Sequence, residues 1–325
     1  MTTTFRRLGP ADLADVTALL AACDVAVLGR TDFTDEEIAS DLRRTDLEAY
    51  GWYDGHGVLA CYGWVHRVDV TDKVQIDAYV HPAHDDRLGL RVLEHLESRA
   101  RELVREVGHE AVVFDIGVYR QDERTRAWMV ERGFEAATLF TRMRIDLDGP
   151  VEVVDPAMVS VRRSEGREED LRAAHRISED AFVEHYGHVS TSYETWLERL
   201  TERGADWADI WLAELDGDPV GVLVGTRQFV EDDNGGYVRT LGTLPSARGL
   251  GVGKALLRAY FAAAQRAGRE AVLLHVDVAN VTGALRLYES VGMRPVLEID
   301  AWTKRVPVAD SDLVNSDLVD SDTPA

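Results

Sequence analysis

The stretch Leu241-Gly-Thr-Leu-Pro-Ser-Ala-Arg248-Gly-Leu-Gly251-Val-Gly253-Lys254 decides the fold expected for the second half of this chain. An apolar run is followed by three glycines at alternate positions and then by a helical pattern from Val252. Glycine lets a backbone approach an anion closely, because no Cβ atom stands in the way. The amide groups at a helix N-terminus also attract negative charge. We therefore predict a pyrophosphate site on this loop, with Arg248 or Lys254 adding positive charge.

Two common phosphate-binding loops do not fit this stretch. A Walker loop needs glycine in place of Arg248 and serine or threonine in place of Ala255. A dinucleotide fingerprint needs a third glycine in place of Lys254 and an acidic residue further on. A strand-to-helix turn without a ligand is the remaining alternative, but three glycines are costly for turning alone. The pattern that remains is Arg-x-x-Gly-x-Gly between a strand and a helix.

A later segment adds a second signature: Val276-Asp-Val-Ala-Asn280-Val-Thr-Gly-Ala284-Leu-Arg-Leu287-Tyr288-Glu-Ser-Val-Gly292-Met293. The two segments together resemble the GNAT superfamily of N-acyltransferases, whose second signature is a strand followed by Asn-x-x-x-Ala-x-x-x-Tyr-x-x-x-Gly-Phe. Met293 replaces the usual aromatic residue, which alters packing only. The resemblance covers the second half of the chain and, more faintly, the first. The layout is similar to actinobacterial tandem proteins of the mycothiol-synthase type.

The resemblance implies direct transfer from acetyl-CoA to an amine in a ternary complex, without a metal. It implies that Tyr288 is the general acid that protonates the leaving thiolate; the alternative is a core aromatic residue on an amphipathic helix. Asn280 resembles a cofactor contact and could also cap the following helix. Pantetheine would pair with the backbone of Leu241 and Thr243 beside a splay in the sheet. The implied cofactor-binding residues are Leu241, Thr243, Arg248, Gly249, Leu250, Gly251, Val252, Gly253, Lys254 and Asn280.

The general base is not marked by a motif. An amine with a reference pKa of about 10.4 is mostly protonated at pH 7, so a group must accept a proton. Glu184 is taken as the candidate, because by analogy with the family its loop borders the acceptor cleft. A base acting through water is also open. The other candidates are His185, Asp232, Asp233 and Asp277.

The chain repeats itself, with five landmarks recurring after 156 to 163 residues. Asp-Gly between apolar runs is one of them, and it predicts a tight hairpin in each repeat. Two similar lobes follow from the repetition. The matched landmarks are Phe5-Arg6-Arg7 with Val161-Arg162-Arg163, Asp12-Leu13 with Asp170-Leu171, Asp54-Gly55 with Asp216-Gly217, Pro82 with Pro245, and Gly133 with Gly292.

The first lobe lacks both signatures. Alignment on the shared prolines puts Asp85, Leu88 and Leu90 in place of the arginine and the last two glycines of the loop. Alignment on the shared glycines puts Met129 in place of the tyrosine. A carboxylate and two bulky side chains should repel a pyrophosphate, so we expect a structural or substrate-shaping lobe.

The expected fold class is α+β, with two GNAT-like lobes. Antiparallel strands followed by a strand-helix-strand unit predict a mixed, mostly antiparallel sheet of six to seven strands flanked by helices. Residues 1–148 form the degenerate lobe and 159–307 the catalytic lobe, joined by a linker at 149–158 with prolines at both ends. Residues 308–325 form a disordered acidic tail. A helix over 281–291 carries Tyr288.

Composition restricts partners and location. A net charge of −22 argues against nucleic acid and anionic membranes and suits a small cationic acceptor. There is no apolar run of about 18 residues and no secretory pattern at the N-terminus, so a cytoplasmic protein is expected. Cys23 and Cys61 are expected to be reduced, buried thiols. Nothing indicates an oligomeric state.

The leading function is an N-acetyltransferase that transfers acetyl from acetyl-CoA to a primary amine of a small molecule. Alternatives in the same class are mycothiol-synthase-like acetylation of a cysteinyl sugar and acetylation of protein amines. A non-catalytic acyl-CoA sensor or scaffold is the alternative from another class. Tyr288 argues against it, since a sensor needs no proton donor.

Overall fold

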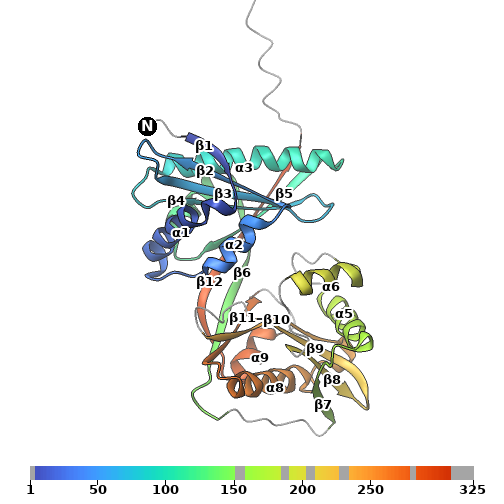
Figure 1. Ribbon diagram of the computed structural model, residues 1–325. Helices are drawn as coiled ribbons and strands as arrows, with labels where there is room; N and C mark the ends of the chain where they lie inside the picture. Colours follow the sequence, from blue (N-terminus) through green and yellow to red (C-terminus); the bar gives the residue numbers. More distant parts are fainter. Residues whose placement is uncertain are drawn as a thin grey trace, which may run out of the picture. The chain divides into compact units, whose positions relative to one another are not determined.

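The computed structural model describes residues 4–150, 158–183, 190–202, 209–226, 234–278 and 283–308. The chain divides into two compact units (Figure 1). Unit 1 contains Met1–Ala137 and Asp300–Ala325, and unit 2 contains Thr138–Ile299.

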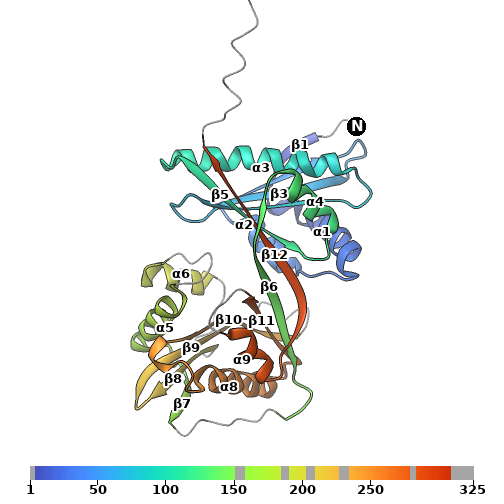
Figure 2. The same ribbon diagram turned by 180° about the vertical axis from the view of Figure 1, so that it is seen from behind.

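Unit 1 is a sheet between two helical layers (Figure 2). Its strand order is β1-β2-β3-β4-β5 and then the end of β12, with β4 and β5 parallel and the earlier neighbours antiparallel. Helices α3 and α4 pack against one face of the sheet and share a hydrophobic core with it. Helices α1 and α2 pack against the other face. The elements are β1 (Thr4–Leu8), α1 (Leu13–Leu28), α2 (Asp35–Arg43), β2 (Leu47–Tyr53), β3 (Leu59–Arg67), β4 (Lys73–Val80), α3 (Asp86–Glu106), β5 (Ala111–Tyr119) and α4 (Glu123–Glu131).

Unit 2 repeats this layering. Its strand order is β6-β11-β10-β9-β8-β7, in which only the β10–β11 pair is parallel among the described strands. The mixed, mostly antiparallel sheet is therefore confirmed. The elements are β6 (Glu135–Asp146), β7 (Val159–Arg163), α5 (Glu168–Phe182), α6 (Tyr193–Glu202), β8 (Ile210–Leu215), β9 (Asp218–Thr226), β10 (Gly235–Thr243), α8 (Val252–Arg266), β11 (Ala271–Asp277), α9 (Ala284–Ser290) and β12 (Arg294–Pro307).

Each unit takes its last strand from the other repeat of the sequence. In unit 2, the end of β6 pairs antiparallel with β11, from Phe140 opposite Asp277 to Asp146 opposite Ala271. In unit 1, the end of β12 lies beside β5, where the Thr303 hydroxyl donates to the carbonyl of Phe114 at 2.8 Å. The sequence repeats, 1–148 and 159–307, and the compact units are thus divided at different points.

Local expectations for one helix and two turns compare with the structure as follows. The described part of the helix that carries Tyr288 spans Ala284–Ser290 and follows Gly283, which has a left-handed φ of 73°; Val281, the expected start, lies outside the described residues. The Asp216-Gly217 turn has positive φ at both residues, as a tight hairpin requires. The β2–β3 turn is longer than an Asp-Gly pair, because the carboxylate of Asp54 accepts from the amides of His56 and Val58.

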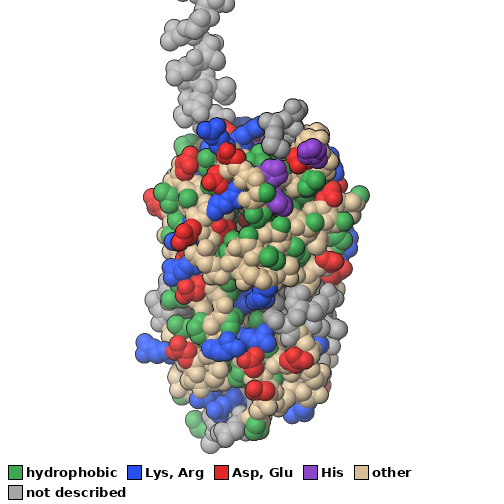
Figure 3. Space-filling model, turned by 90° about the vertical axis from the view of Figure 1, so that its left-hand side faces the viewer, with side chains coloured by type: hydrophobic (Ala, Val, Ile, Leu, Met, Phe, Trp, Pro, Cys, Tyr) green, Lys and Arg blue, Asp and Glu red, His purple; other side chains and the backbone are tan. Residues whose placement is uncertain are grey.

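The surface and the thiols agree with a globular protein. Lys and Arg side chains are interspersed with Asp and Glu on the face in Figure 3. None of the helices in the described ranges is long and apolar enough to cross a membrane. Cys23 and Cys61 are both free, and burial raises the pKa of each thiol to about 12.

Candidate active site

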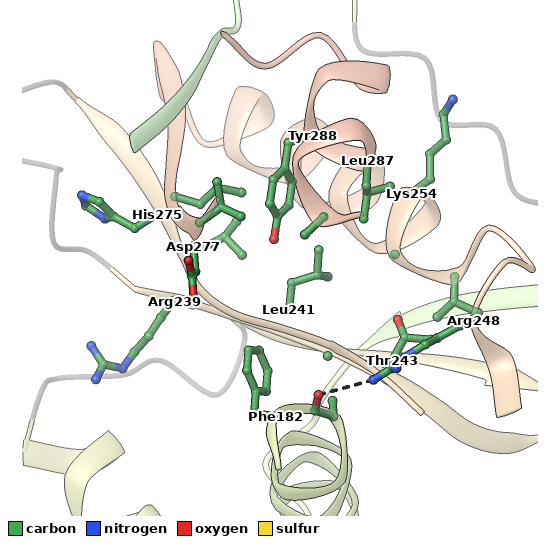
Figure 4. Close-up of a pocket in the computed structure, with 18 of the residues that line it drawn as sticks. Phe182, Arg239, Leu241, Thr243, Arg248, Lys254, His275, Asp277, Leu287 and Tyr288 are labelled. Atoms are coloured by element: carbon green, nitrogen blue, oxygen red, sulfur yellow. Dashed lines mark hydrogen bonds between the residues drawn. The ribbon is translucent and has the colours of Figure 1, made fainter. Parts of the chain in front are cut away.

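A split between β10 and β11 creates a cavity in unit 2. The two strands pair from Gly235 and Ala271 to Val238 and Leu274. Beyond that point, Thr240–Thr243 pair with β9 and the end of β11 pairs with β6. The register of β10 also shifts between Val238 and Thr240, which marks a β-bulge. A cavity of about 660 Å³ lies at this split (Figure 4).

The glycine loop forms one end of the cavity. Gly249 and Gly251 have φ values of 81° and 84°, which other residues adopt only with strain, and Gly251 is the N-cap of α8. A Cβ on Gly253 would lie 2.9 Å from Cδ2 of Leu287, so this glycine allows α9 to approach α8 closely. The sequence predicts only an anion-binding role for Gly253, whereas the structure shows that it also has a packing role.

Two cations lie at the same end. The guanidinium of Arg248 donates to the carbonyl of Ala181 at 3.5 Å, shown dashed in Figure 4. Lys254 lies in the first turn of α8, and both side chains line the cavity. Positive charge and the helix N-terminus therefore act on the same space.

Tyr288 lies on α9, farther along the cavity. Its side chain is 8% exposed, and Figure 4 shows its hydroxyl directed towards Leu241 on β10. Burial raises the pKa of Tyr288 further above its ordinary value near 10. The hydroxyl is therefore protonated at neutral pH and can donate a proton.

The other end of the cavity carries a polar cluster on β11. Thr138 donates its hydroxyl proton to the carboxylate of Asp277. Arg142 donates from Nε to Nε2 of His275 at 3.0 Å, and the hydroxyl of Tyr237 lies 2.9 Å from Nδ1. Arginine has no acceptor, so Nε2 must be unprotonated and the imidazole is neutral, with both ring nitrogens in hydrogen bonds. Burial raises the pKa of Tyr237 to about 12.

Most of the expected site residues line this one cavity; they are Leu241, Thr243, Arg248, Gly249, Gly251, Val252, Gly253, Lys254 and Tyr288. Leu250 lies in the same loop with a 45% exposed side chain. Glu184 and Asn280 lie outside the described residues, as do His185, Asp232 and Asp233.

The lining residues that the sequence did not point to include Phe140, Phe182, Arg239 and His275. Phe140 belongs to the first repeat, and only the strand exchange brings it to this site. Phe182 and Arg239 belong to no signature. The alternation of β11, which puts His275 on the same face as Asp277, was the one available signal.

In unit 1, the corresponding loop is closed by the protein's own side chains. Arg124 donates to the carbonyls of Val80 at 3.4 Å and His84 at 2.5 Å, and to the carboxylate of Asp86 at 2.5 Å. Val80 corresponds to Thr243 when the two prolines are aligned. The carboxylate of Asp85 caps α3 by accepting from the amide of Arg87.

Side-chain packing closes the same region. A Cβ on Gly89 would lie 2.7 Å from the ring of Trp128, which therefore covers the first turns of α3. Met129, the counterpart of Tyr288, is fully buried. The backbone of unit 1 that corresponds to the cavity-lining backbone of unit 2 is therefore already hydrogen-bonded and covered by side chains.

Known proteins share this architecture. The family model described as "Acetyltransferase (GNAT) family" matches residues 171–293. Mycothiol acetyltransferase of Thermomonospora curvata is 32% identical over 240 residues, which are 73% of this chain and 75% of that one. Mycothiol acetyltransferase of Geodermatophilus obscurus is 30% identical over 304 residues, 88% and 92% of the two chains. The crystal structure of a GCN5-related N-acetyltransferase from Sphaerobacter thermophilus has a TM-score of 0.81 at 25% identity and covers 95% of this chain and 96% of that chain.

A tandem GNAT protein from the clavulanic acid biosynthesis pathway shares the fold, with a TM-score of 0.71 at 20% identity over 96% of this chain and 100% of that chain. The fold, the glycine loop at the strand split and these relatives define an acyl-CoA-dependent N-acetyltransferase. The chain belongs to the GNAT family of acetyltransferases.

Proposed function

We propose that this protein transfers acetyl from acetyl-CoA to the primary amine of a small molecule, by direct attack in a ternary complex. One observation carries the proposal: a single cavity has the glycine loop at one end and the Tyr288 hydroxyl on its wall. The pyrophosphate would bind the amides of the loop with Arg248 and Lys254. Pantetheine would lie along β10 at Leu241 and Thr243, and Asn280 would be a further contact.

The chemistry requires two proton movements. The acceptor ammonium loses a proton to a base, and the amine nitrogen then attacks the thioester carbonyl. The C–N bond forms, the C–S bond breaks, and the thiolate takes a proton from Tyr288. The second proton lost by the nitrogen returns the tyrosine to its protonated form through solvent.

Asp277 is better suited than His275 to act as the general base. Both ring nitrogens of His275 are already in hydrogen bonds, so it cannot accept a proton without losing Arg142. The carboxylate of Asp277 has two acceptor oxygens and lines the cavity. We propose that Asp277 accepts the proton directly or through a water molecule. Glu184 remains a second candidate for this role.

Asp277→Asn is expected to lower kcat/KM for the amine by about a hundredfold or more at neutral pH. The deficit should shrink as the pH approaches the amine pKa, because more acceptor then arrives deprotonated. Rates of CoA release, measured from about pH 6.5 to about pH 10, would cover the range over which the amine loses its proton. Asp115→Asn, on the corresponding strand of unit 1, is the matched control. An unchanged pH profile for Asp277→Asn would assign the base elsewhere.

Calorimetry is expected to show one acetyl-CoA site per chain, because Arg124 and Trp128 close the region in unit 1. Gly251→Ala should weaken binding by about tenfold or more, as the loss of hydrogen bonds to a charged group does. Gly217→Ala is the control, because Gly217 has a similar φ of 87° and lies in a hairpin turn. Two sites per chain would contradict the closed state of unit 1. No binding would rule out the proposed function.

A second candidate rests on the relatives' names. Several similar proteins are called mycothiol acetyltransferase, which favours a cysteinyl sugar as acceptor. In a cysteinyl group the carboxyl is already bonded to the sugar, so this acceptor presents an amine without a carboxylate.

A further inference from the structure

Arg239 lies at the β-bulge of β10, where the pairing with β9 shifts between Val238 and Thr240. Its side chain is exposed and lines the cavity. Figure 4 shows Arg239 on the side of Asp277 and His275, away from Arg248 and Lys254. The cavity therefore has cations at both ends, and only one end has the glycine loop.

The arginines at the two ends of the cavity differ in the hydrogen bonds that they make with the rest of the protein. Arg248 donates to the carbonyl of Ala181, whereas Arg239 forms no hydrogen bond or ion pair with any residue that the structure describes. The carboxylate of Asp277 is held by Thr138, and His275 is neutral. Among the described residues that line this end, where the acceptor amine is proposed to bind, the carboxylate of Asp277 and the guanidinium of Arg239 can both contact a ligand.

We propose that the acceptor is an amino acid, with its amine at Asp277 and its carboxylate bound by Arg239. The guanidinium presents a planar pair of N–H donors that matches a carboxylate in a bidentate arrangement. A single arginine balances the single charge of a carboxylate. The rings of Phe140 and Phe182 line the same cavity and supply an apolar wall for the rest of the acceptor. This proposal rests on the proposed function, and it disfavours the cysteinyl sugar.

The test compares matched acceptors, L-leucine with L-leucinamide first and then other standard amino acids with their amides, by CoA release from the full chain. Arg239→Gln is expected to lower kcat/KM for the acids by about tenfold or more, while the amides and the KM for acetyl-CoA stay unchanged. Taking the ratio of acid to amide within each variant cancels the difference in amine pKa. Arg266→Gln, at the exposed end of α8, is the control and should change neither ratio.

Equal losses on acids and amides, or no loss on either, would overturn the role of Arg239. Wild-type acetylation of amides alone would leave the proposed function intact and refute the amino acid as acceptor. If no amine is acetylated, calorimetry with CoA and the same amino acids separates the two ideas. Binding that depends on Arg239 would then support the carboxylate site while the transfer function fails, and no binding of any amino acid would refute the site as well.

Discussion

Replacing Tyr288 with phenylalanine is expected to lower kcat by about a hundredfold to ten-thousandfold while the Kd for acetyl-CoA stays unchanged. This substitution removes only the hydroxyl group, which faces the strand split at which the thioester is proposed to lie. Burial keeps the pKa of this hydroxyl high, so the wild-type group is a proton donor over the whole neutral range. Single-turnover measurements of CoA release, combined with calorimetry, separate chemistry from binding.

A buried tyrosine elsewhere in unit 2 supplies the control. Tyr260 on α8 is 5% exposed, and its hydroxyl lies 3.5 Å from the carbonyl of Tyr237. Tyr260→Phe should change stability slightly and kcat hardly at all. Equal turnover by Tyr288→Phe and the wild type would mean that the thiolate is protonated by another group or by water.

Division of the chain between residues 149 and 158 is expected to abolish the folding of both halves. A fragment ending at 148 lacks Trp302, which is buried in the core of unit 1, and Lys304, which pairs with the fully buried Glu97 at 2.8 Å. Glu97 keeps Arg132 at 3.0 Å in that fragment, so the larger loss is the buried side chain of Trp302. Removal of a buried tryptophan side chain costs about 3–5 kcal/mol, a large part of a domain's stability of about 5–15 kcal/mol. The division also leaves one side of β5 unpaired.

The second half has the complementary defect. Without the first repeat it lacks residues 138–146 and therefore the partner of β11 and the fully buried Met143. Circular dichroism and thermal unfolding of each fragment, alone and after co-expression, measure the effect. Co-expression should restore cooperative unfolding. A fragment of residues 1–148 that is monomeric and unfolds cooperatively by itself would contradict this expectation.

Local signals in the sequence predicted much of the fold. The helical pattern from Val252 is observed as α8 (Val252–Arg266), and its Leu256 and Leu257 are fully buried. These features depend on hydrophobic periodicity within a few residues of each position. The glycine loop was equally visible, because positive φ at Gly249 and Gly251 has a strict residue preference.

Long-range pairing was not visible in the same way. Both β6 and β12 have the pattern of a last strand, and periodicity states which face is buried but not which neighbour is paired. The exchange of last strands therefore left no local signal in the sequence. For the same reason, the approach of Phe140 to the site could not be predicted. The exposure of Arg239 to the cavity depends on a one-residue bulge, which composition does not mark.

The exchange of last strands also sets an order of events during synthesis on the ribosome. Unit 1 needs residues 300–308, which are translated only after the whole of Thr138–Ile299. At about 5–20 residues per second, the nascent first half waits roughly ten to thirty seconds for its final strand. During that interval the edge of β5 has no partner and can pair with other chains. The protein should therefore depend on holding chaperones, and on the pace of translation, more than a GNAT protein with a single lobe.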